Sequence, residues 1–184
     1  MSDNSFELPL RGLRVMVTGA TGLLGLPLCL ELAKENLVFA VARFSDQRQA
    51  AALKADQVVP IALDLTSTDF STLPSDIDVV FHLAALTSTS GGAGASQAAY
   101  IDATAYGSGR LMSRLRSARA FVYTSSAAVY AFQERAVREA DPYGLMHNLE
   151  DYALSKIGAE VLLQFLSSEW GVPTVILRVF SMFS

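Results

Sequence analysis

Tyr152 and Lys156 stand four residues apart in a stretch with a helical pattern, so their side chains lie on one face of the helix, one turn apart. A phenol beside an ammonium can exchange a proton with a substrate hydroxyl. Far upstream, the sequence TGATGLLG at 18–25 follows an apolar run and precedes a second helical pattern. The backbone amides of such a turn, with the N-terminus of the next helix, bind a pyrophosphate. Together the two motifs predict an enzyme that uses a nicotinamide cofactor for redox chemistry.

The three glycines of the upstream motif have separate tasks in this interpretation. Gly19 permits the tight turn, and Gly22 lets the backbone approach a phosphate. Gly25 lets the next helix pack closely on a sheet, and Leu23 and Leu24 are expected to begin that helix. An ordinary strand, turn and helix with incidental glycines is the alternative.

Apolar segments rich in β-formers alternate with helical patterns along the chain, which is typical of βαβ units. We predict strands at 13–18, 38–43, 58–62, 79–83, 120–124 and 174–179, and helices at 23–35, 46–55, 96–117 and 151–170. These elements predict an α/β fold, a doubly wound parallel sheet of the Rossmann type with helices on both faces. The ligand crevice is expected at the carboxyl ends of the strands, where the motifs lie.

Length and composition limit the class of protein. With 184 residues, 51% of them hydrophobic, the chain can form one core, and we expect a tail at 1–12 and a dinucleotide-binding domain at 13–184. No apolar run reaches the roughly 18 residues that span a bilayer, and the first residues are polar, so we expect a cytoplasmic protein without membrane contact. A net charge of −4 with scattered arginines argues against nucleic acid as a partner. Cys29 is the only cysteine, which excludes an internal disulfide and a thiolate metal cluster, and we predict no metal site.

Four further motifs follow predicted strands in chain order. They are Asp64, the sequence HLAA at 82–85, the sequence TSSAAVY at 124–130 and the sequence LRVF at 177–180. With the glycine motif and the pair Tyr152 and Lys156, this ordered set resembles the extended short-chain dehydrogenase/reductases, the family of nucleotide-sugar epimerases and dehydratases. The resemblance covers the chain from about residue 13 to its end.

The resemblance implies three catalytic residues. Tyr152 would be the acid/base that exchanges a proton with a substrate hydroxyl while hydride passes to or from the nicotinamide. Lys156, with the positive oxidised nicotinamide, would lower the tyrosine pKa from about 10 and would bond the nicotinamide ribose. Ser126 would orient the substrate hydroxyl, and its neighbour Ser125 matches this role less well.

The same resemblance implies the cofactor contacts. Asp64 would accept a hydrogen bond from the adenine amino group, Leu65 would pack on the ring, and Ala84 and Ala85 would leave room for the cofactor. An exposed turn aspartate is the alternative for Asp64, and His82 is expected to be structural. The complete predicted cofactor-binding set is Gly19, Thr21, Gly22, Leu23, Leu24, Gly25, Arg43, Asp64, Leu65, Leu83, Ala84, Ala85, Thr124, Tyr152 and Lys156.

Several positions depart from the family pattern or allow two interpretations. Arg43 ends the second strand, where a carboxylate would hold the ribose hydroxyls of NAD. A guanidinium suits a 2′-phosphate, so we expect NADP rather than NAD, unless Arg43 only lies along the sheet edge. Thr104 stands where the family has an asparagine, so that supporting hydrogen bond stays open. Glu160 and Arg178 match family positions but are equally well explained as charges on a helix surface or at a sheet end.

The resemblance also narrows the reaction. The sequence SAA at 126–128 stands where a sugar 4,6-dehydratase carries Thr-Asp-Glu, so we favour an epimerase or a reductase acting on a nucleotide sugar or a related alcohol or ketone. Arg43 favours the reductase, because NADPH serves net reduction. A catalytically silent NAD(P)-binding module is the alternative, and a flavin or nucleotide sensor is a weaker one.

Three expectations concern regions around the site. The family continues beyond the position of residue 184, so we expect the C-terminal substrate domain to be absent. The helices at 96–117 and 151–170 match those that commonly pair across a two-fold axis in the family, which implies a homodimer. The glycine-rich stretch at 91–94 is either a lid over the crevice or a plain linker.

Overall fold

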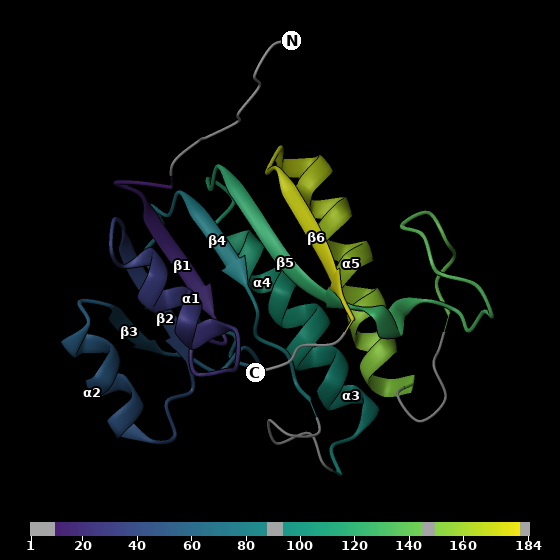
Figure 1. Cartoon of the computed structure of the whole chain (residues 1–184), viewed down its shortest axis with the longest axis horizontal. Coiled ribbons are helices and arrows are strands. Elements are labelled where there is room, and N and C mark those ends of the chain that lie inside the picture. The colour runs from purple at the N-terminus through teal and green to yellow at the C-terminus, as the bar shows by residue number, and fades with distance from the viewer. Residues whose placement is uncertain (1–9, 88–93, 145–149, 181–184) are drawn as a thin grey trace.

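Six strands form one parallel sheet in the computed structural model of the chain (Figure 1), which describes residues 10–87, 94–144 and 150–180. The strand order is β3-β2-β1-β4-β5-β6. The strands are β1 (Arg14–Thr18), β2 (Leu37–Ala42), β3 (Val59–Ala62), β4 (Val79–His82), β5 (Ala120–Ser126) and β6 (Thr174–Val179). The order reverses between β1 and β4, which is where a doubly wound sheet opens a ligand crevice. The predicted fold class is confirmed.

Helices cover both faces of the sheet. On one face lie α1 (Gly25–Leu32) and α2 (Gln47–Ala55), and on the other lie α3 (Gln97–Tyr100), α4 (Gly107–Arg114) and α5 (Glu150–Trp170). Side chains alternate along each strand, so each face has its own core. In β1, Val15 packs with Cys29 of α1, whereas the next residue, Met16, packs in the core of α4 and α5.

The six predicted strands are all present, with boundaries shifted by one or two residues at most. β6 has the predicted bounds, and β5 continues beyond residue 124 through Ser125 and Ser126. The extension follows from pairing, because these two serines lie opposite Arg178 and Val179 of β6. The alternation along β5 puts Ser125 in the buried row and leaves Ser126 in the other row.

The single helix predicted at 96–117 is wrong in detail. The structure has α3, then the π-helix η2 (Ile101–Tyr106), then α4. In the π-helical turn the Gly107 N–H donates to the carbonyl of Asp102, one residue further back than in an α-helix. The buried residues Tyr100, Thr104, Ser108 and Met112 recur every four residues across this stretch, so the spacing of buried positions does not reveal the π-helical turn.

The helix predicted at 23–35 is shorter in the structure. α1 begins at Gly25, so Leu23 and Leu24 belong to the turn before it and do not begin the helix. The backbone bonds after Leu32 tighten to a spacing of three residues, which ends the helix. The two leucines therefore contribute their backbone to the glycine turn.

Part of the predicted tail contacts the domain. The Gly12 N–H donates to the Glu35 carbonyl over 2.8 Å, and the Asn36 amide donates to the Leu10 carbonyl over 2.7 Å. Residues 1–9 and 91–93 lie outside the described residues, so the domain division and the choice between lid and linker stay predictions. No helix in the described part of the chain combines the length and apolar character needed to cross a membrane.

Candidate functional site

A cavity of about 590 Å³ opens at the carboxyl edge of the sheet. Its walls come from the glycine turn, from the segments that follow β2, β3 and β4, from the end of β5 and from the first turns of α5. All the predicted site residues line it, namely Gly19, Thr21, Gly22, Leu23, Leu24, Gly25, Arg43, Asp64, Leu65, Leu83, Ala84, Ala85, Thr124, Ser126, Tyr152 and Lys156. Motifs far apart in the sequence therefore meet in one cavity.

The glycine turn approaches the segment after β4 closely. Gly19 has a φ of +69°, a left-handed conformation that favours glycine, and a Cβ there would lie 2.9 Å from Ala84 N. The Ala84 N–H donates to the Thr18 hydroxyl over 3.2 Å, which holds the two segments together. Gly22 also lines the cavity, so at Gly19 and Gly22 the turn presents backbone alone. This surface fits the approach of a pyrophosphate.

Gly25→Ala is expected to destabilise the fold by about 1–3 kcal/mol. The added Cβ would lie 2.1 Å from the Gly19 carbonyl oxygen and 2.8 Å from Ala20 Cα, so α1 must shift away from the turn. Urea unfolding measures the effect, with Gly158→Ala in α5 as the matched control. A Cβ on Gly158 would make only an ordinary 3.4 Å contact, so that variant should equal or exceed the native stability. Equal destabilisation by both variants would contradict the argument.

Two side chains of α5 reach the end of β5 inside the cavity. Lys156 is 2% exposed, and its Nζ donates to the Thr124 carbonyl over 2.7 Å. Tyr152 is hydrogen-bonded to the Ser126 hydroxyl, and the Ser126 Oγ accepts from the Ala128 N–H over 3.2 Å. Lys156 Nζ lies 5.9 Å from the centre of the Tyr152 ring. A hydroxyl, a phenol and an amine therefore form one cluster on the cavity wall.

Burial has the largest effect on the pKa values of Tyr152 and Lys156. Burial raises the pKa of Tyr152 above 10.0, and the hydrogen bond with Ser126 only partly offsets that rise. Burial also lowers the pKa of Lys156 to about 7, although the charge of Glu160 acts in the opposite direction. The lysine is therefore only partly charged at neutral pH, which weakens its attraction for a phenolate. The prediction that Lys156, together with the positive oxidised nicotinamide, lowers the pKa of Tyr152 concerns the cavity with its cofactor bound and stays a prediction.

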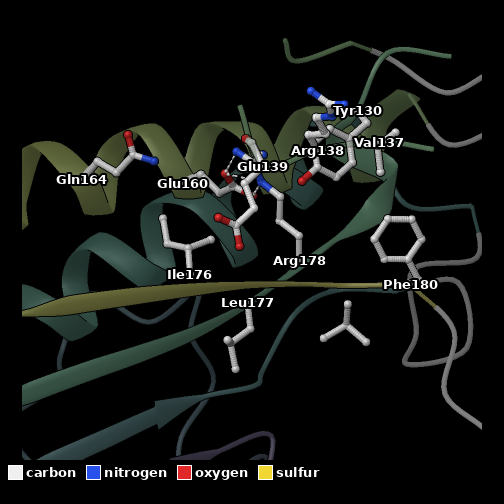
Figure 2. A pocket seen from close by; sticks show the side chains of 11 residues that line it. Tyr130, Val137, Arg138, Glu139, Glu160, Gln164, Ile176, Leu177, Arg178 and Phe180 are labelled. Atoms are coloured by element: carbon white, nitrogen blue, oxygen red, sulfur yellow. Dashed lines mark hydrogen bonds and ion pairs between the residues drawn. The ribbon is translucent and has the colours of Figure 1, made fainter. Parts of the chain in front are cut away.

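Glu160 and Arg178 form an ion pair in a second pocket, which Figure 2 shows from close by. Glu160 has no exposed surface, and its carboxylate accepts from Arg178 Nη2 over 2.8 Å. The hydroxyl of Ser125 donates to the same carboxylate, as does that of Tyr143 over 3.0 Å. A carboxylate removed from water needs donors of this kind. The interpretation of Glu160 as a helix-surface charge is therefore wrong, and Ser125 bonds to it rather than to Tyr152.

Asp64 and Arg43 line the cavity near the ends of β3 and β2. Asp64 Oδ1 accepts from the N–H and the hydroxyl of Thr66, over 2.9 and 2.8 Å. Burial raises the pKa of Asp64, but these two bonds and the charge of Arg43 outweigh burial and lower the pKa overall. Asp64 is thus a turn residue and also a carboxylate on the cavity wall, so the two interpretations of it are compatible.

His82 and Thr104 form hydrogen bonds with Thr18 and Leu86, which line the cavity. His82 is fully buried, and its ring nitrogens bond the hydroxyls of Thr18 at 2.6 Å and Ser108 at 2.8 Å. Burial and the charge of Lys156 lower the pKa of His82 to about 3, so the ring is neutral near pH 7. The Thr104 hydroxyl accepts from the Leu86 N–H over 3.4 Å. Threonine therefore supplies a supporting bond of its own at this position.

The cavity also has lining residues that the sequence analysis missed. Ala99 and Ala103 line it from α3 and η2, and Thr66 lines it beside Asp64. Two alanines four residues apart in a helical pattern were a signal, since small residues on one helix face let a ligand come close. Thr66 follows Asp64 by two residues, which is the spacing of an Asx turn and was a second signal.

The comparisons with known proteins point to relatives of one kind. Among curated proteins, the chain is 27% identical to the uncharacterized UDP-glucose epimerase YtcB of Bacillus subtilis (strain 168), covering 93% of this chain and 57% of that protein. Among solved structures, it is similar to the UDP-glucuronic acid 4-epimerase from Bacillus cereus in complex with NAD, with 27% identity and a TM-score of 0.79 over 93% of this chain and 57% of that one.

A second solved structure agrees. The UDP-N-acetylglucosamine 4-epimerase from Methanobrevibacter ruminantium M1, in complex with UDP-N-acetylmuramic acid, is 25% identical with a TM-score of 0.82, covering 95% of this chain and 56% of that one. The chain therefore spans little more than half the length of these relatives. The family model of the NAD-dependent epimerases and dehydratases matches residues 15–184. The chain belongs to the NAD-dependent epimerase/dehydratase family.

Proposed function

We propose that this chain carries the cofactor-binding and proton-transfer part of an NAD(P)-dependent epimerase or oxidoreductase that acts at a carbinol carbon of a nucleotide sugar. The observation that carries the proposal is the shared cavity, because the glycine turn and the cluster of Ser126, Tyr152 and Lys156 face the same space. The glycine turn, Asp64 and Leu65 would hold the dinucleotide. When bound, the dinucleotide supplies the acceptor and donor of hydride.

The proposed proton transfer uses only side chains of this chain. Tyr152 would take the proton of the substrate hydroxyl as the carbon is oxidised and return it when the carbon is reduced. Ser126, hydrogen-bonded to Tyr152, would orient that hydroxyl. Lys156 is anchored on the Thr124 carbonyl and would hold the ribose next to the nicotinamide. Burial raises the pKa of Tyr152 and so favours the protonated phenol. The positive charge of the oxidised nicotinamide, once bound in the cavity, would lower that pKa.

The proposed substrate class rests on the relatives and on the cavity. The similar solved structures include 4-epimerases named for UDP-glucuronic acid and UDP-N-acetylglucosamine. Ala127 and Ala128 follow Ser126 in this chain, so the acid and base of a dehydratase are missing there. Proton NMR of the chain with NAD(P) and either UDP-sugar tests the proposal, because inversion at C4 changes the ring coupling constants. Failure to bind any dinucleotide would overturn it.

Arg43 is proposed to select NADP over NAD, because it lines the cavity beside Asp64 and its guanidinium matches a 2′-phosphate. We expect NADP to bind about tenfold more tightly than NAD, which corresponds to roughly 1.4 kcal/mol. Arg43→Asp should reverse the order, as calorimetric titration would show. NAD is the alternative cofactor, since the similar Bacillus cereus structure contains it.

The matched control for this titration is Arg48→Asp. Arg48 forms an exposed ion pair with Asp46 at 2.8 Å and is not among the described residues that line the cavity. Arg48→Asp should leave the ratio of the NADP and NAD affinities unchanged. Equal affinities in the native chain, or tighter binding of NAD, would remove the proposed role of Arg43 and favour an epimerase that keeps and recycles its cofactor.

The proposal includes a homodimer formed through α4 and α5. Val161 and Phe165 lie four residues apart on α5 and are 52% and 60% exposed. Tyr106, directly before α4, is 57% exposed. Exposed apolar side chains gathered on adjacent helices support an interface between two copies of the chain.

A further inference from the structure

Arg110 of α4 bonds to two segments that line the cavity. Its Nη2 donates to the Leu65 carbonyl over 2.7 Å and to the Asp102 carbonyl over 3.2 Å, and it pairs with Asp102 Oδ1 at 3.0 Å. Leu65 lines the cavity beside Asp64, and Asp102 directly precedes the lining residue Ala103 of η2. We propose that Arg110 is a positioning residue that sets the spacing of these two walls and so the affinity for the adenosine half of the dinucleotide. This inference rests on the proposed function.

Gly107 of α4 packs directly against Leu65 of the same cavity wall. A Cβ on Gly107 would lie 2.9 Å from Leu65 Cβ and 3.1 Å from the Leu65 carbonyl oxygen. Gly107 and Arg110 are three residues apart, so they occupy one face of α4. Leu65 rests against Gly107 and therefore has no room to move toward the helix. The bond from Arg110 keeps it from moving away.

The π-helical turn provides the second anchor point. The Asp102 carbonyl accepts from the Gly107 N–H and also from Arg110, so η2 and α4 are joined through backbone and side chain at one residue. π-helical turns occur frequently at functional sites. Here the turn places Ala103 on the cavity wall and Asp102 behind it, within reach of Arg110.

Stability is a poor explanation for an arginine at this position. Arg110 Nε is buried and has no hydrogen-bond partner among the described residues, which is unfavourable. The pair with Asp102 is partly exposed, with side-chain exposures of 27% and 41%, and such pairs contribute little to stability. A methionine would keep much of the apolar stem. The bonds to Leu65 and Asp102 are what the guanidinium supplies beyond that stem.

The test compares two halves of the dinucleotide, 5′-AMP and nicotinamide mononucleotide, by ligand-observed NMR titration of the full chain. Arg110→Met should weaken the binding of 5′-AMP about tenfold while leaving nicotinamide mononucleotide unchanged. The matched control is Arg114→Met. Arg114 lies one turn further along α4 and donates from Nε to the Leu73 carbonyl over 3.1 Å, and Leu73 is not among the described lining residues. Arg114→Met should leave the affinities for 5′-AMP and for nicotinamide mononucleotide unchanged.

Each outcome decides the inference. Equal losses for the two probes, or equal losses in Arg110→Met and Arg114→Met, would overturn it, because both indicate general loosening. If circular dichroism shows that Arg110→Met does not fold, Asp102→Asn decides instead, since it removes only the charge that holds the guanidinium. That variant should weaken 5′-AMP about threefold and spare the other probe, and an unchanged 5′-AMP affinity would overturn the inference. A native chain that binds neither probe nor NAD(P) would overturn the proposed function itself.

Discussion

Tyr152→Phe should lower the rate at which a UDP-sugar reduces the bound nicotinamide by about 10²- to 10⁴-fold, the usual contribution of a positioned acid/base. The variant removes one oxygen atom and keeps the ring that packs near Lys156. Dinucleotide affinity should therefore stay within about twofold of native, because the lost interaction matters only while the proton moves. Stopped-flow absorbance of the reduced nicotinamide measures the rate, and calorimetry measures the affinity.

The control for this variant is Tyr106→Phe. Tyr106 is 57% exposed and is not among the described residues that line the cavity, so its loss should change neither quantity. A Tyr152→Phe chain that reduces the nicotinamide at the native rate would show that another group moves the proton. A native chain that binds the dinucleotide but never reduces it would favour the silent module.

Glu160→Ala should destabilise the fold by about 3–5 kcal/mol, the range seen when one partner of a buried ion pair is removed. The substitution leaves the Arg178 guanidinium, whose side chain is only 16% exposed, without the carboxylate that now accepts from it. It also leaves the buried hydroxyl of Ser125 without its acceptor. Urea unfolding, followed by circular dichroism, gives the free energy of unfolding.

Two further variants serve as controls for Glu160→Ala. Glu31→Ala breaks an exposed pair with Lys34, whose side chains are 71% and 66% exposed, and should change the stability by less than about 1 kcal/mol. The double variant Glu160→Leu with Arg178→Leu removes both charges and should recover part of the loss. If Glu160→Ala proved no more harmful than Glu31→Ala, the carboxylate would not be buried as the structure places it.

The strands were predictable because parallel strands buried on both faces read as continuous apolar runs. The period of two along β5 also explains why Ser126 and not Ser125 reaches Tyr152. The π-helix η2 was not predictable, because buried residues recur at helical spacing from α3 through η2 to α4. The periodicity of apolar residues therefore revealed the strands and helices but not the π-helix η2 between α3 and α4.

Part of the site depended on distant contacts. The burial of Glu160 comes from Arg178, Ser125 and Tyr143, which reach it from other elements, and charge alone suggested a surface residue. The lowered pKa of Lys156 likewise reflects how completely the fold encloses it. The burial of Glu160 and the pKa of Lys156 both depend on how completely the fold excludes water. A sequence motif does not reveal the extent of that exclusion.

The position of β1 in the middle of the sheet has a consequence for how the chain acquires its binding capacity. The hydroxyl of Thr18 bonds His82 across 64 residues of sequence, so the two halves of the sheet meet only after a long loop has closed. Because the cavity draws its walls from both halves, we expect a chain in which only one half of the sheet has formed to lack the complete cavity. A dinucleotide at a hundredfold excess over its dissociation constant would therefore stabilise the finished fold alone, by about 2.7 kcal/mol. Under the proposed function, the supply of dinucleotide in a cell would therefore affect the amount of folded protein as well as the rate of its reaction.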